Sequence, residues 1–295
     1  MDKLYSPATI QKIKNKYEFQ LSKSLGQNFL IDGNLVGRII ENSLIDKEDL
    51  VIEVGPGIGV LTAEAAKEAR KVIAVEIDRN LIPILQETLA GYDNIEIINR
   101  DIMKTDFREI IKNAEKGNKR PFNSVKIIGN LPYYITTPII MKVLEEDGRD
   151  LVDNITIMLQ KEVADRIRAI PGSKAYGALS VMVQYYCIVD KIASVSKEVF
   201  MPKPKVDSSV IRLTICKEPP VELDNEGTFF AVVKAGFGQR RKTLLNSLNG
   251  IYGFSKEEVK EVMSKAGINP NRRAETLDMK EFAVLSNSIY KGIRD

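Results

Sequence analysis

A glycine-rich segment between an expected strand and an expected helix is the first part of this sequence that could bind a small molecule. The segment Glu53–Gly59 has glycines at 55, 57 and 59 and follows the apolar run Leu50–Val54. Glycine lets the backbone pass close to a ligand, and the following helix offers free N–H groups. Glu76 ends the next apolar run, where a carboxylate can accept hydrogen bonds from both hydroxyls of a ribose. These features predict a nucleotide-like ligand.

The glycine spacing separates classes of nucleotide. The dinucleotide fingerprint has glycines at its first, third and sixth positions, whereas here they stand at the first, third and fifth. That disfavours a nicotinamide dehydrogenase, and the segment resembles the first motif of S-adenosylmethionine-dependent methyltransferases. The resemblance implies that Asp101 faces the adenine amine and that Ile77 and Ile102 sandwich the adenine ring. For Asp101 the alternative is an ordinary cap at the end of a strand.

The segment Asn130-Leu131-Pro132-Tyr133 indicates the reaction. An exocyclic adenine amine is a weak nucleophile because its lone pair is delocalised into the ring. Acceptors that engage its two hydrogens favour a pyramidal nitrogen, and the Asn130 side-chain oxygen and the Leu131 carbonyl could do so. Pro132 would fix the backbone, and Tyr133 would supply a stacking face for the base. The alternative is a strand-ending turn with a buried tyrosine.

Several other chemistries are excluded by composition. The chain has no histidine, which removes Ser-His-Asp triads, Cys-His pairs and His-based zinc sites. The two cysteines, Cys187 and Cys216, are too few for a disulfide framework or a cysteine zinc site, so no metal is expected. Neither lies beside the motifs above, where a cytosine-C5 methyltransferase would need its nucleophile. Amine methylation needs no strong base, because the nitrogen becomes acidic once it carries the methyl group.

The pattern of apolar runs predicts the elements that hold these residues. Helical patterns separate five β-branched runs, which argues for a parallel sheet covered on both faces. These runs are Leu50–Val54, Val72–Glu76, Ile95–Ile98, Val125–Ile128 and Ile155–Leu159. Two further strands, Lys191–Val199 and Ser208–Ile215, are expected antiparallel at one edge. The prediction is an α/β, Rossmann-like fold with a mostly parallel seven-stranded sheet.

A second domain is expected after Cys216. The run Lys217-Glu218-Pro219-Pro220 breaks the chain, and from Asn225 onward the pattern is helical. We therefore predict a first domain over residues 1–218 and a small all-helical domain over 219–295.

The distribution of charge along the chain, more than the net charge, indicates binding of a polyanion. Forty-three basic and forty acidic residues leave only +3. Between Ala231 and Tyr252, however, Lys234, Arg240, Arg241 and Lys242 occur without any acid. Such a cluster can bind phosphate or can be ordinary solvated surface. On a helix, the three consecutive cations would fan across about 200°.

The first residues contain charge where a secretory signal would be apolar, and no apolar run approaches the length of a membrane span. We expect a cytoplasmic protein with no membrane association.

Longer motifs extend the resemblance over nearly the whole chain. They are the segments 25–30 (LGQNFL), 200–209 (FMPKPKVDSS) and 237–244 (FGQRRKTL), together with the glycine loop and Asn130–Tyr133. With these motifs the chain is identified as a member of the rRNA adenine N6-dimethyltransferase family, of the type that acts on small-subunit rRNA.

This resemblance implies roles for individual residues. Asn28 and Leu30 match the motif that closes over the methionine part of S-adenosylmethionine. The cofactor positions matched by the family are Asn28, Leu30, Gly55, Glu76, Asp101 and Asn130. Phe200 matches an aromatic that faces the acceptor base, although it could instead be a core residue. The helical domain would bind rRNA through Arg240, Arg241 and Lys242.

The implied activity moves four methyl groups onto two adjacent adenosines in the 3′-terminal hairpin loop of small-subunit rRNA, within the immature subunit. A monomer is expected. One alternative is the antibiotic-resistance branch, which methylates large-subunit rRNA, but the segment Gln239–Lys242 favours the small-subunit enzyme. Another is a non-catalytic assembly or transcription factor on the same fold, against which the intact Asn130, Pro132, Tyr133, Glu76 and Asp101 argue.

Overall fold

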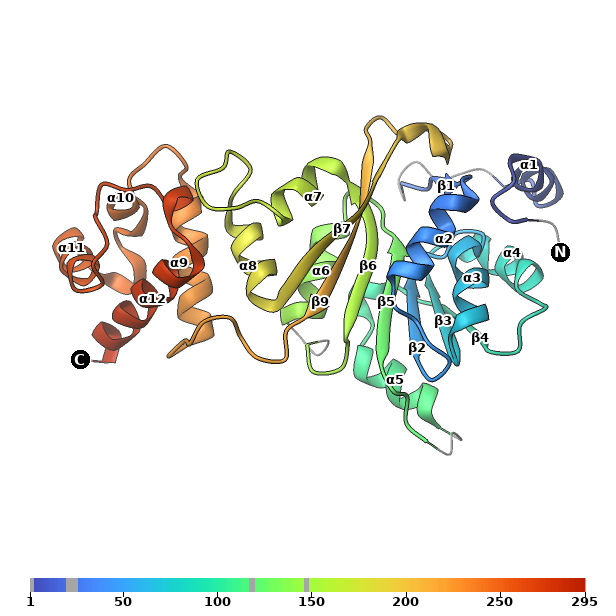
Figure 1. The fold of residues 1–295 in the computed structure, drawn as a ribbon, viewed down its shortest axis with the longest axis horizontal. Helices are drawn as coiled ribbons and strands as arrows, with labels where there is room; N and C mark the ends of the chain where they lie inside the picture. Colours follow the sequence, from blue (N-terminus) through green and yellow to red (C-terminus); the bar gives the residue numbers. More distant parts are fainter. Residues whose placement is uncertain (1–2, 20–25, 117–119, 146–148, 295) are drawn as a thin grey trace. The chain divides into compact units, whose positions relative to one another are not determined.

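The computed structural model describes residues 3–19, 26–116, 120–145 and 149–294 (Figure 1). Contacts between Cα atoms divide the chain into two compact units. The first comprises Met1–Ala164 with Ile188–Ile215, and the second comprises Asp165–Cys187 with Cys216–Asp295. Among the described residues, no helix combines the length and apolar character needed to cross a membrane.

A seven-stranded sheet forms the centre of the first unit (Figure 1). Its strands, in spatial order, are β4 (Ile95–Asn99), β3 (Lys71–Glu76), β2 (Leu50–Val54), β5 (Val125–Asn130), β6 (Asn154–Gln160), β9 (Ser208–Ile215) and β7 (Cys187–Val195). The first five are parallel, and β9 pairs with β6 in the antiparallel direction. The predicted α/β fold with a mostly parallel seven-stranded sheet is confirmed.

Burial explains why these runs are continuous rather than alternating. Every residue of β2 is buried, and the same holds for β5 and β6 except for their last residues. A strand buried on both faces needs apolar side chains on both, which Val, Ile and Leu supply. At the edge of the sheet, β4 has no fully buried residue.

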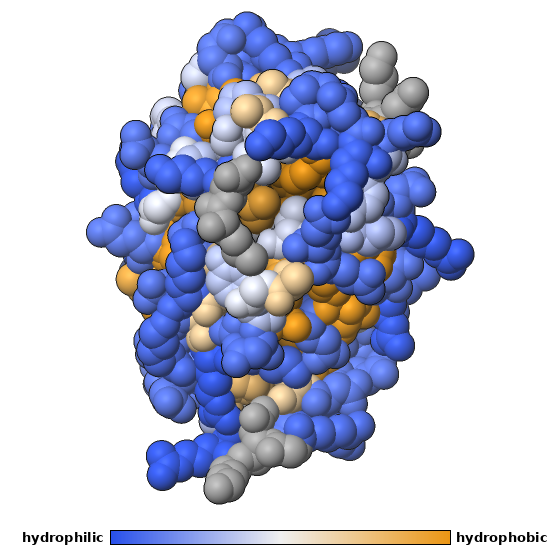
Figure 2. All heavy atoms as spheres, turned by 90° about the vertical axis from the view of Figure 1, so that its right-hand side faces the viewer, coloured by the Kyte–Doolittle hydropathy of each residue, from blue (hydrophilic) through white to orange (hydrophobic). Residues whose placement is uncertain are grey.

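Helices of the first unit connect and cover these strands (Figure 1). They are α1 (Pro7–Lys16), α2 (Gly33–Asn42), α3 (Val60–Glu68), α4 (Ile82–Thr88), α5 (Phe107–Glu115) and α6 (Thr136–Glu145), followed by α7 (Lys161–Ile167), where the chain passes into the second unit. Asp32 and Asp106 cap α2 and α5, each accepting hydrogen bonds from backbone N–H groups of the first turn. Figure 2 views this part of the molecule from the side of α1 and shows apolar atoms in hollows between hydrophilic side chains.

A short two-stranded sheet holds the N-terminal segment in place. The strands β1 (Phe29–Leu30) and β8 (Phe200–Met201) are antiparallel, with Phe29 opposite Met201 and Leu30 opposite Phe200. The backbone N–H of Ile31 also donates to the Val199 carbonyl, at 2.9 Å. Segments about 170 residues apart in sequence are therefore joined by backbone hydrogen bonds.

The second unit is helical. Its helices are α8 (Ala178–Tyr186), α9 (Glu226–Gly238), α10 (Leu244–Leu248), α11 (Lys256–Lys265) and α12 (Met279–Arg294). An aromatic cluster joins α8 to α9: the ring of Tyr185 lies 5.4 Å from those of Phe229 and Phe230, and its hydroxyl donates to Glu226 at 2.8 Å. The expected helical C-terminal region is confirmed for α9–α12.

Three details differ from the sequence-based expectations. Residues 165–187 belong to the same compact unit as the C-terminal helices, although they were expected in the first domain. One reason is that the ring of Tyr185 packs against Phe229, a contact between distant residues that no local sequence pattern indicates. The expected strand Lys191–Val199 is wrong in its bounds. Strand β7 covers Cys187–Val195, and Lys197–Val199 is a 3-10 helix. The domain boundary at residue 218 stays a prediction about independent folding.

The third difference concerns the basic cluster. The expectation that Arg240, Arg241 and Lys242 lie on a helix is wrong, because α9 ends at Gly238 and these residues form the turn before α10.

Gly129 in β5 provides a test of the packing at the centre of the sheet. A Cβ atom there would lie 2.7 Å from the Val54 carbonyl oxygen of β2, a backbone atom that cannot move aside. We expect Gly129→Ala to lower the free energy of unfolding by about 1–3 kcal/mol through overpacking. Gly37→Ala is the matched control, because its Cβ would meet nothing within 4 Å and it lies in α2. That change should raise stability by about 0.5–1 kcal/mol in urea denaturation. Equal effects of both changes would contradict the proposed packing.

Candidate active site

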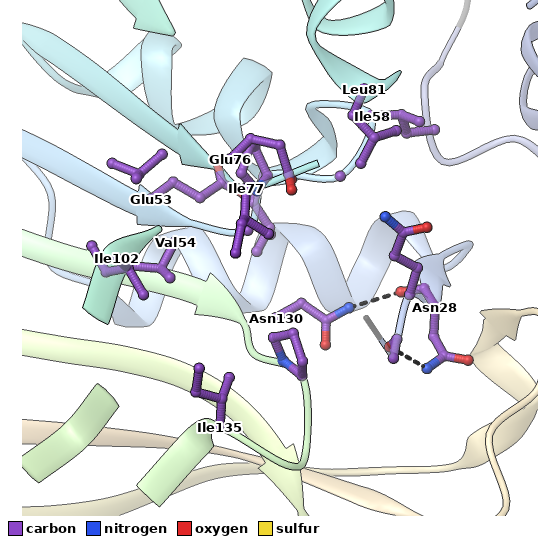
Figure 3. Close-up of a pocket in the computed structure, with 18 of the residues that line it drawn as sticks. Asn28, Glu53, Val54, Ile58, Glu76, Ile77, Leu81, Ile102, Asn130 and Ile135 are labelled. Carbon is purple, nitrogen blue, oxygen red and sulfur yellow. Dashed lines mark hydrogen bonds between the residues drawn. The ribbon is translucent and has the colours of Figure 1, made fainter. Parts of the chain in front are cut away.

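A pocket of the first unit opens at the carboxyl ends of β2, β3 and β5 (Figure 3). The strand order reverses between β2 and β5, since β3 and β4 lie on one side of β2 and β6 lies beyond β5. Ligands of open α/β sheets bind at such a reversal, because the loops on either side leave in opposite directions. The cofactor positions expected from sequence, Asn28, Leu30, Gly55, Glu76, Ile77, Asp101, Ile102 and Asn130, all line this pocket.

The glycine loop forms one wall. Gly55, Gly57 and Gly59 have φ values of 70°, 61° and 88°, a left-handed conformation that L side chains rarely adopt. A Cβ on Gly55 would meet nothing within 4 Å, so the backbone borders open space there. A Cβ on Gly57 would lie 3.1 Å from the ring of Phe29. The N-terminal segment therefore passes directly over the loop and closes that side of the pocket.

Glu76 ends β3 with its carboxylate in the pocket wall (Figure 3). Its Oε1 accepts the backbone N–H of Asp78 at 2.8 Å, and Asp78 in turn accepts from the Gln27 side chain at 2.7 Å. Burial raises the pKa of Glu76 to about 7, although hydrogen bonds from backbone N–H groups oppose that rise. A ligand that donated further hydrogen bonds to this carboxylate would stabilise its ionised form.

Glu53 is a second buried carboxyl group of the pocket. It is 1% exposed, and among the described residues no group donates to its Oε2. Burial raises the pKa of Glu53 to about 8, and the nearby Glu76 adds to the rise. In the sequence, Glu53 stands out only as part of the glycine segment. A carboxyl group with a pKa above neutrality is mostly protonated at pH 7, so it can donate as well as accept a hydrogen bond.

The far end of the pocket is apolar with one carboxylate. Ile77 is 48% exposed although it borders the pocket, whereas Ile102 is 7% exposed. Asp101 uses Oδ1 to accept the backbone N–H of Met103 at 2.9 Å, so it does cap the 3-10 helix Ile102–Lys104. Its side chain nevertheless lines the pocket. An exposed isoleucine beside a carboxylate suits a flat, polar-edged ring.

Asn130, the last residue of β5, is held by the N-terminal segment (Figure 3). Its Nδ2 donates to the backbone carbonyl of Asn28 at 2.9 Å, while the Asn28 side chain donates to the Gly26 carbonyl at 2.9 Å. This bond fixes which way the Asn130 amide is turned. Among the described residues none donates a hydrogen bond to its Oδ1, which remains available as an acceptor.

The residues after Asn130 divide into two groups. Pro132 lines the pocket, and so does Tyr134, for which sequence reasoning assigned no role. Leu131 is buried, and its N–H donates to the Met158 carbonyl at 3.2 Å. Tyr133 is half-buried, and its hydroxyl lies 2.8 Å from Ser208 Oγ in β9. Leu131 and Tyr133 do not line the pocket.

Phe200 is placed differently from the expectation. It is 4% exposed and belongs to the hydrophobic core next to Leu30. In this structure its side chain faces the protein interior, so contact with a base would require β8 to move. Its role toward RNA stays a prediction.

The three cations of the basic cluster in the second unit differ in their contacts. The Arg240 guanidinium donates to the carbonyls of Lys174 and Tyr176, at 3.5 and 3.3 Å. Arg241 and Lys242 are exposed on the same turn. All three side chains are exposed, but the Arg240 guanidinium contacts backbone carbonyls of its own unit, which distinguishes it from Arg241 and Lys242.

Sequence reasoning missed several pocket residues. Gln27 and Phe29 stood inside the N-terminal motif but were assigned no role, and Ile58 and Leu81 had no signal beyond an apolar pattern. Within the described part of the chain, no group of three or more cysteine or acidic side chains could hold a metal ion.

Comparison with known proteins places the chain in a family. The model of the ribosomal RNA adenine dimethylase family matches residues 18–291. The chain is 52% identical over 289 residues to ribosomal RNA small subunit methyltransferase A of Clostridioides difficile (strain 630), covering 98% of each protein. It is 47% identical to the protein of that name from Bacillus mycoides (strain KBAB4), again over 98% of each.

Solved structures agree with this assignment. A dimethyladenosine transferase from Plasmodium falciparum superposes with a TM-score of 0.73 at 26% identity, over 87% of this chain and 95% of that one. The 23S rRNA methyltransferase ErmE superposes with a TM-score of 0.66 at 27% identity, over 89% and 99%. The fold, the pocket and a family match over nearly the whole length lead to one conclusion: this chain belongs to the ribosomal RNA adenine dimethylase family.

Proposed function

We propose that the protein transfers methyl groups from S-adenosylmethionine to the N6 amines of two adjacent adenosines in the 3′-terminal hairpin loop of small-subunit rRNA, during assembly of that subunit. The observation that carries the proposal is the Asn130 amide at the end of β5. It borders the same pocket as Glu76 and is turned by Asn28 so that its oxygen is available. A non-catalytic role would not need this orientation.

The pocket fits S-adenosylmethionine. When bound, this cofactor supplies an electrophilic methyl group on a positively charged sulfur. Glu76 would hold the ribose hydroxyls, Asp101 the adenine amine, and Ile77 with Ile102 the faces of the ring. Asn28 and Leu30 border the pocket beside the glycine loop, where the methionine part would lie.

The chain's own contribution to the reaction is orientation of the amine. The Asn130 Oδ1 and the Leu131 carbonyl would accept the two amine hydrogens, which favours the pyramidal nitrogen needed for attack. Tyr133 would stack on the base, and Pro132 limits the freedom of the backbone between them. Water can take the proton released from the methylated nitrogen, so the absence of histidine is no obstacle.

The choice of small-subunit rRNA is supported by the relatives named ribosomal RNA small subunit methyltransferase A, with 52% and 47% identity over nearly the full length. The large-subunit alternative is represented by ErmE, at 27% identity. A direct test is to incubate the protein with labelled S-adenosylmethionine and immature small or large subunits, and to map the modified bases. Methylation only in the large subunit would contradict the proposal.

Glu76→Ala should weaken cofactor binding much more than RNA binding. The loss of charge-assisted hydrogen bonds to the ribose should weaken the binding free energy of S-adenosylmethionine by about 1.5–3 kcal/mol, which calorimetry measures. Glu96→Ala is the matched control, because Glu96 lies on the neighbouring strand β4, is exposed and pairs with Lys71. Unchanged cofactor affinity in Glu76→Ala would exclude the ribose assignment.

Cofactor affinity should depend on pH near neutrality. The pKa of Glu76 is raised to about 7 by burial, and the ionised form is the better acceptor for two hydroxyls. Affinity should therefore be highest above pH 7 and should fall as the carboxylate is protonated below it. Calorimetry between about pH 5.5 and 8.5 measures this, and Glu76→Gln should remove the part of the dependence that Glu76 causes. The same profile in both proteins would assign the titration to another group.

Asn130→Ala should leave both ligands bound but remove most turnover. The Asn130 Oδ1 acts chiefly when the amine becomes pyramidal, so its removal should lower kcat rather than the affinity for either ligand. We expect a fall of about a hundredfold or more, by analogy with the removal of one preorganised polar contact in other active sites. Single-turnover methylation with saturating cofactor measures the effect. A rate near that of the wild type would refute the amine-orienting role.

The basic turn of the helical unit should act in RNA binding through Arg241 and Lys242. Replacing both with alanine should weaken subunit binding and reduce its salt dependence by up to about one unit of slope for each phosphate that is no longer bound. Arg240→Ala is the internal comparison, because that guanidinium already binds two backbone carbonyls. It should lower the unfolding temperature with less effect on the salt slope. If the Arg241/Lys242 variant keeps the wild-type slope, the rRNA is bound elsewhere.

A further inference from the structure

The hydroxyl of Tyr133 has a partner inside the protein. It lies 2.8 Å from the Oγ of Ser208, the first residue of β9. Tyr133 itself stands in the turn between β5 and α6, on a different chain segment from its partner. Because the hydroxyl bonds to Ser208 at that end, the ring face is the part of Tyr133 that would stack on a substrate base.

Ser208 is a fixed point of the structure. It is fully buried and pairs with Gln160 of β6 in the central sheet. The preceding residue, Asp207, is held on two sides: its carbonyl accepts the N–H of Lys161 and its Oδ1 accepts the N–H of Lys197, both at 3.0 Å. Because this backbone is part of the sheet, the Ser208 hydroxyl can change position only by rotation about the Cα–Cβ bond.

The turn that carries Tyr133 is anchored at both ends by other bonds. The Leu131 N–H donates to Met158 at 3.2 Å, and the Pro132 carbonyl accepts the Ile135 N–H at 3.1 Å and the Thr136 hydroxyl at 3.0 Å. These bonds fix the backbone but not the side-chain torsions of Tyr133. The bond to Ser208 fixes the far end of the ring.

We propose that Ser208 is a positioning residue for methyl transfer: it holds the Tyr133 hydroxyl so that the ring stays in place for stacking on the acceptor adenine. This inference rests on the proposed function. It assigns the Tyr133 hydroxyl to the protein rather than to the substrate. Burial raises the pKa of the Tyr133 phenol, which agrees with a group that stays protonated and transfers no proton.

Ser209 is a control supplied by the chain itself. It is the next residue of β9, is also fully buried, and pairs with Leu159 of the same strand β6. Its Oγ finds no hydrogen-bond partner among the described residues. Ser208→Ala and Ser209→Ala therefore delete the same atom at adjacent positions, and only the first deletes a bond to Tyr133.

The experiment measures kcat and KM with S-adenosylmethionine and immature small subunits for Ser208→Ala, Tyr133→Phe, the double variant and Ser209→Ala. Loss of one hydrogen bond predicts a fall in kcat of about fivefold in Ser208→Ala and in Tyr133→Phe. The double variant should fall no further, because both changes remove the same bond. KM for S-adenosylmethionine should not change, since neither residue lines that pocket. Ser209→Ala should keep the wild-type kcat.

Thermal unfolding of the same four variants tests the bond independently of activity. Non-additive shifts for Ser208→Ala and Tyr133→Phe would support the bond itself. Wild-type kcat in Ser208→Ala would overturn the positioning role, as would additive losses in the double variant. A much larger loss in Tyr133→Phe than in Ser208→Ala would mean that the hydroxyl contacts the substrate, which also overturns it. If the wild type itself methylates no subunit, the proposed function fails, and the unfolding data still decide whether the bond exists.

Discussion

The hydrogen bond from the Asn130 amide to the Asn28 carbonyl is the interaction that makes the candidate site usable. An asparagine side chain can turn either its oxygen or its NH2 group toward a ligand, and the proposed amine orientation needs the oxygen. The backbone of Asn28 takes one hydrogen of the NH2 group at 2.9 Å and thereby selects the orientation. If Asn130 orients the amine as proposed, catalysis at the end of β5 requires that the N-terminal segment be in place.

Several contacts keep that segment there. The pairing of β1 with β8 ties it to residues 200–201, the Phe29 ring lies over Gly57, and Gln27 donates to Asp78 beside Glu76. The same segment therefore contacts the glycine loop, a residue close to the proposed ribose ligand and the proposed amine acceptor. A ligand bound in the pocket would therefore meet the same segment that orients the Asn130 amide, so cofactor binding and the proposed amine orientation would share one structural element.

Burial has a chemical consequence in this pocket. Two carboxyl groups, Glu53 and Glu76, lie within a few per cent of full burial, and burial raises the pKa of each to near or above neutrality. A protein tolerates such groups where a bound partner restores the lost solvation. The donors of a nucleoside and the positive charge of S-adenosylmethionine would do so. The free-energy cost of burying the two carboxyl groups in the free protein would then favour that ligand over one without such donors.

Local sequence patterns were enough to identify the strands in the parallel part of the sheet and to place Gly55, Glu76 and Asn130 directly after or at strand ends. The family resemblance, not a local pattern, supplied the other predicted residues of the pocket, among them Asn28, Asp101 and Ile102. Runs such as Leu50–Val54 and Val125–Asn130 are apolar on both faces, a local property visible without a structure, and motif residues follow strand ends. The remaining features came from tertiary packing, because they depend on pairs of residues far apart in the chain. Phe200 is buried because β8 pairs with β1, Arg240 turns to the 174–176 carbonyls, and Tyr133 meets Ser208 seventy-five residues later. No local periodicity encodes such contacts, since each partner is chosen by how the chain packs.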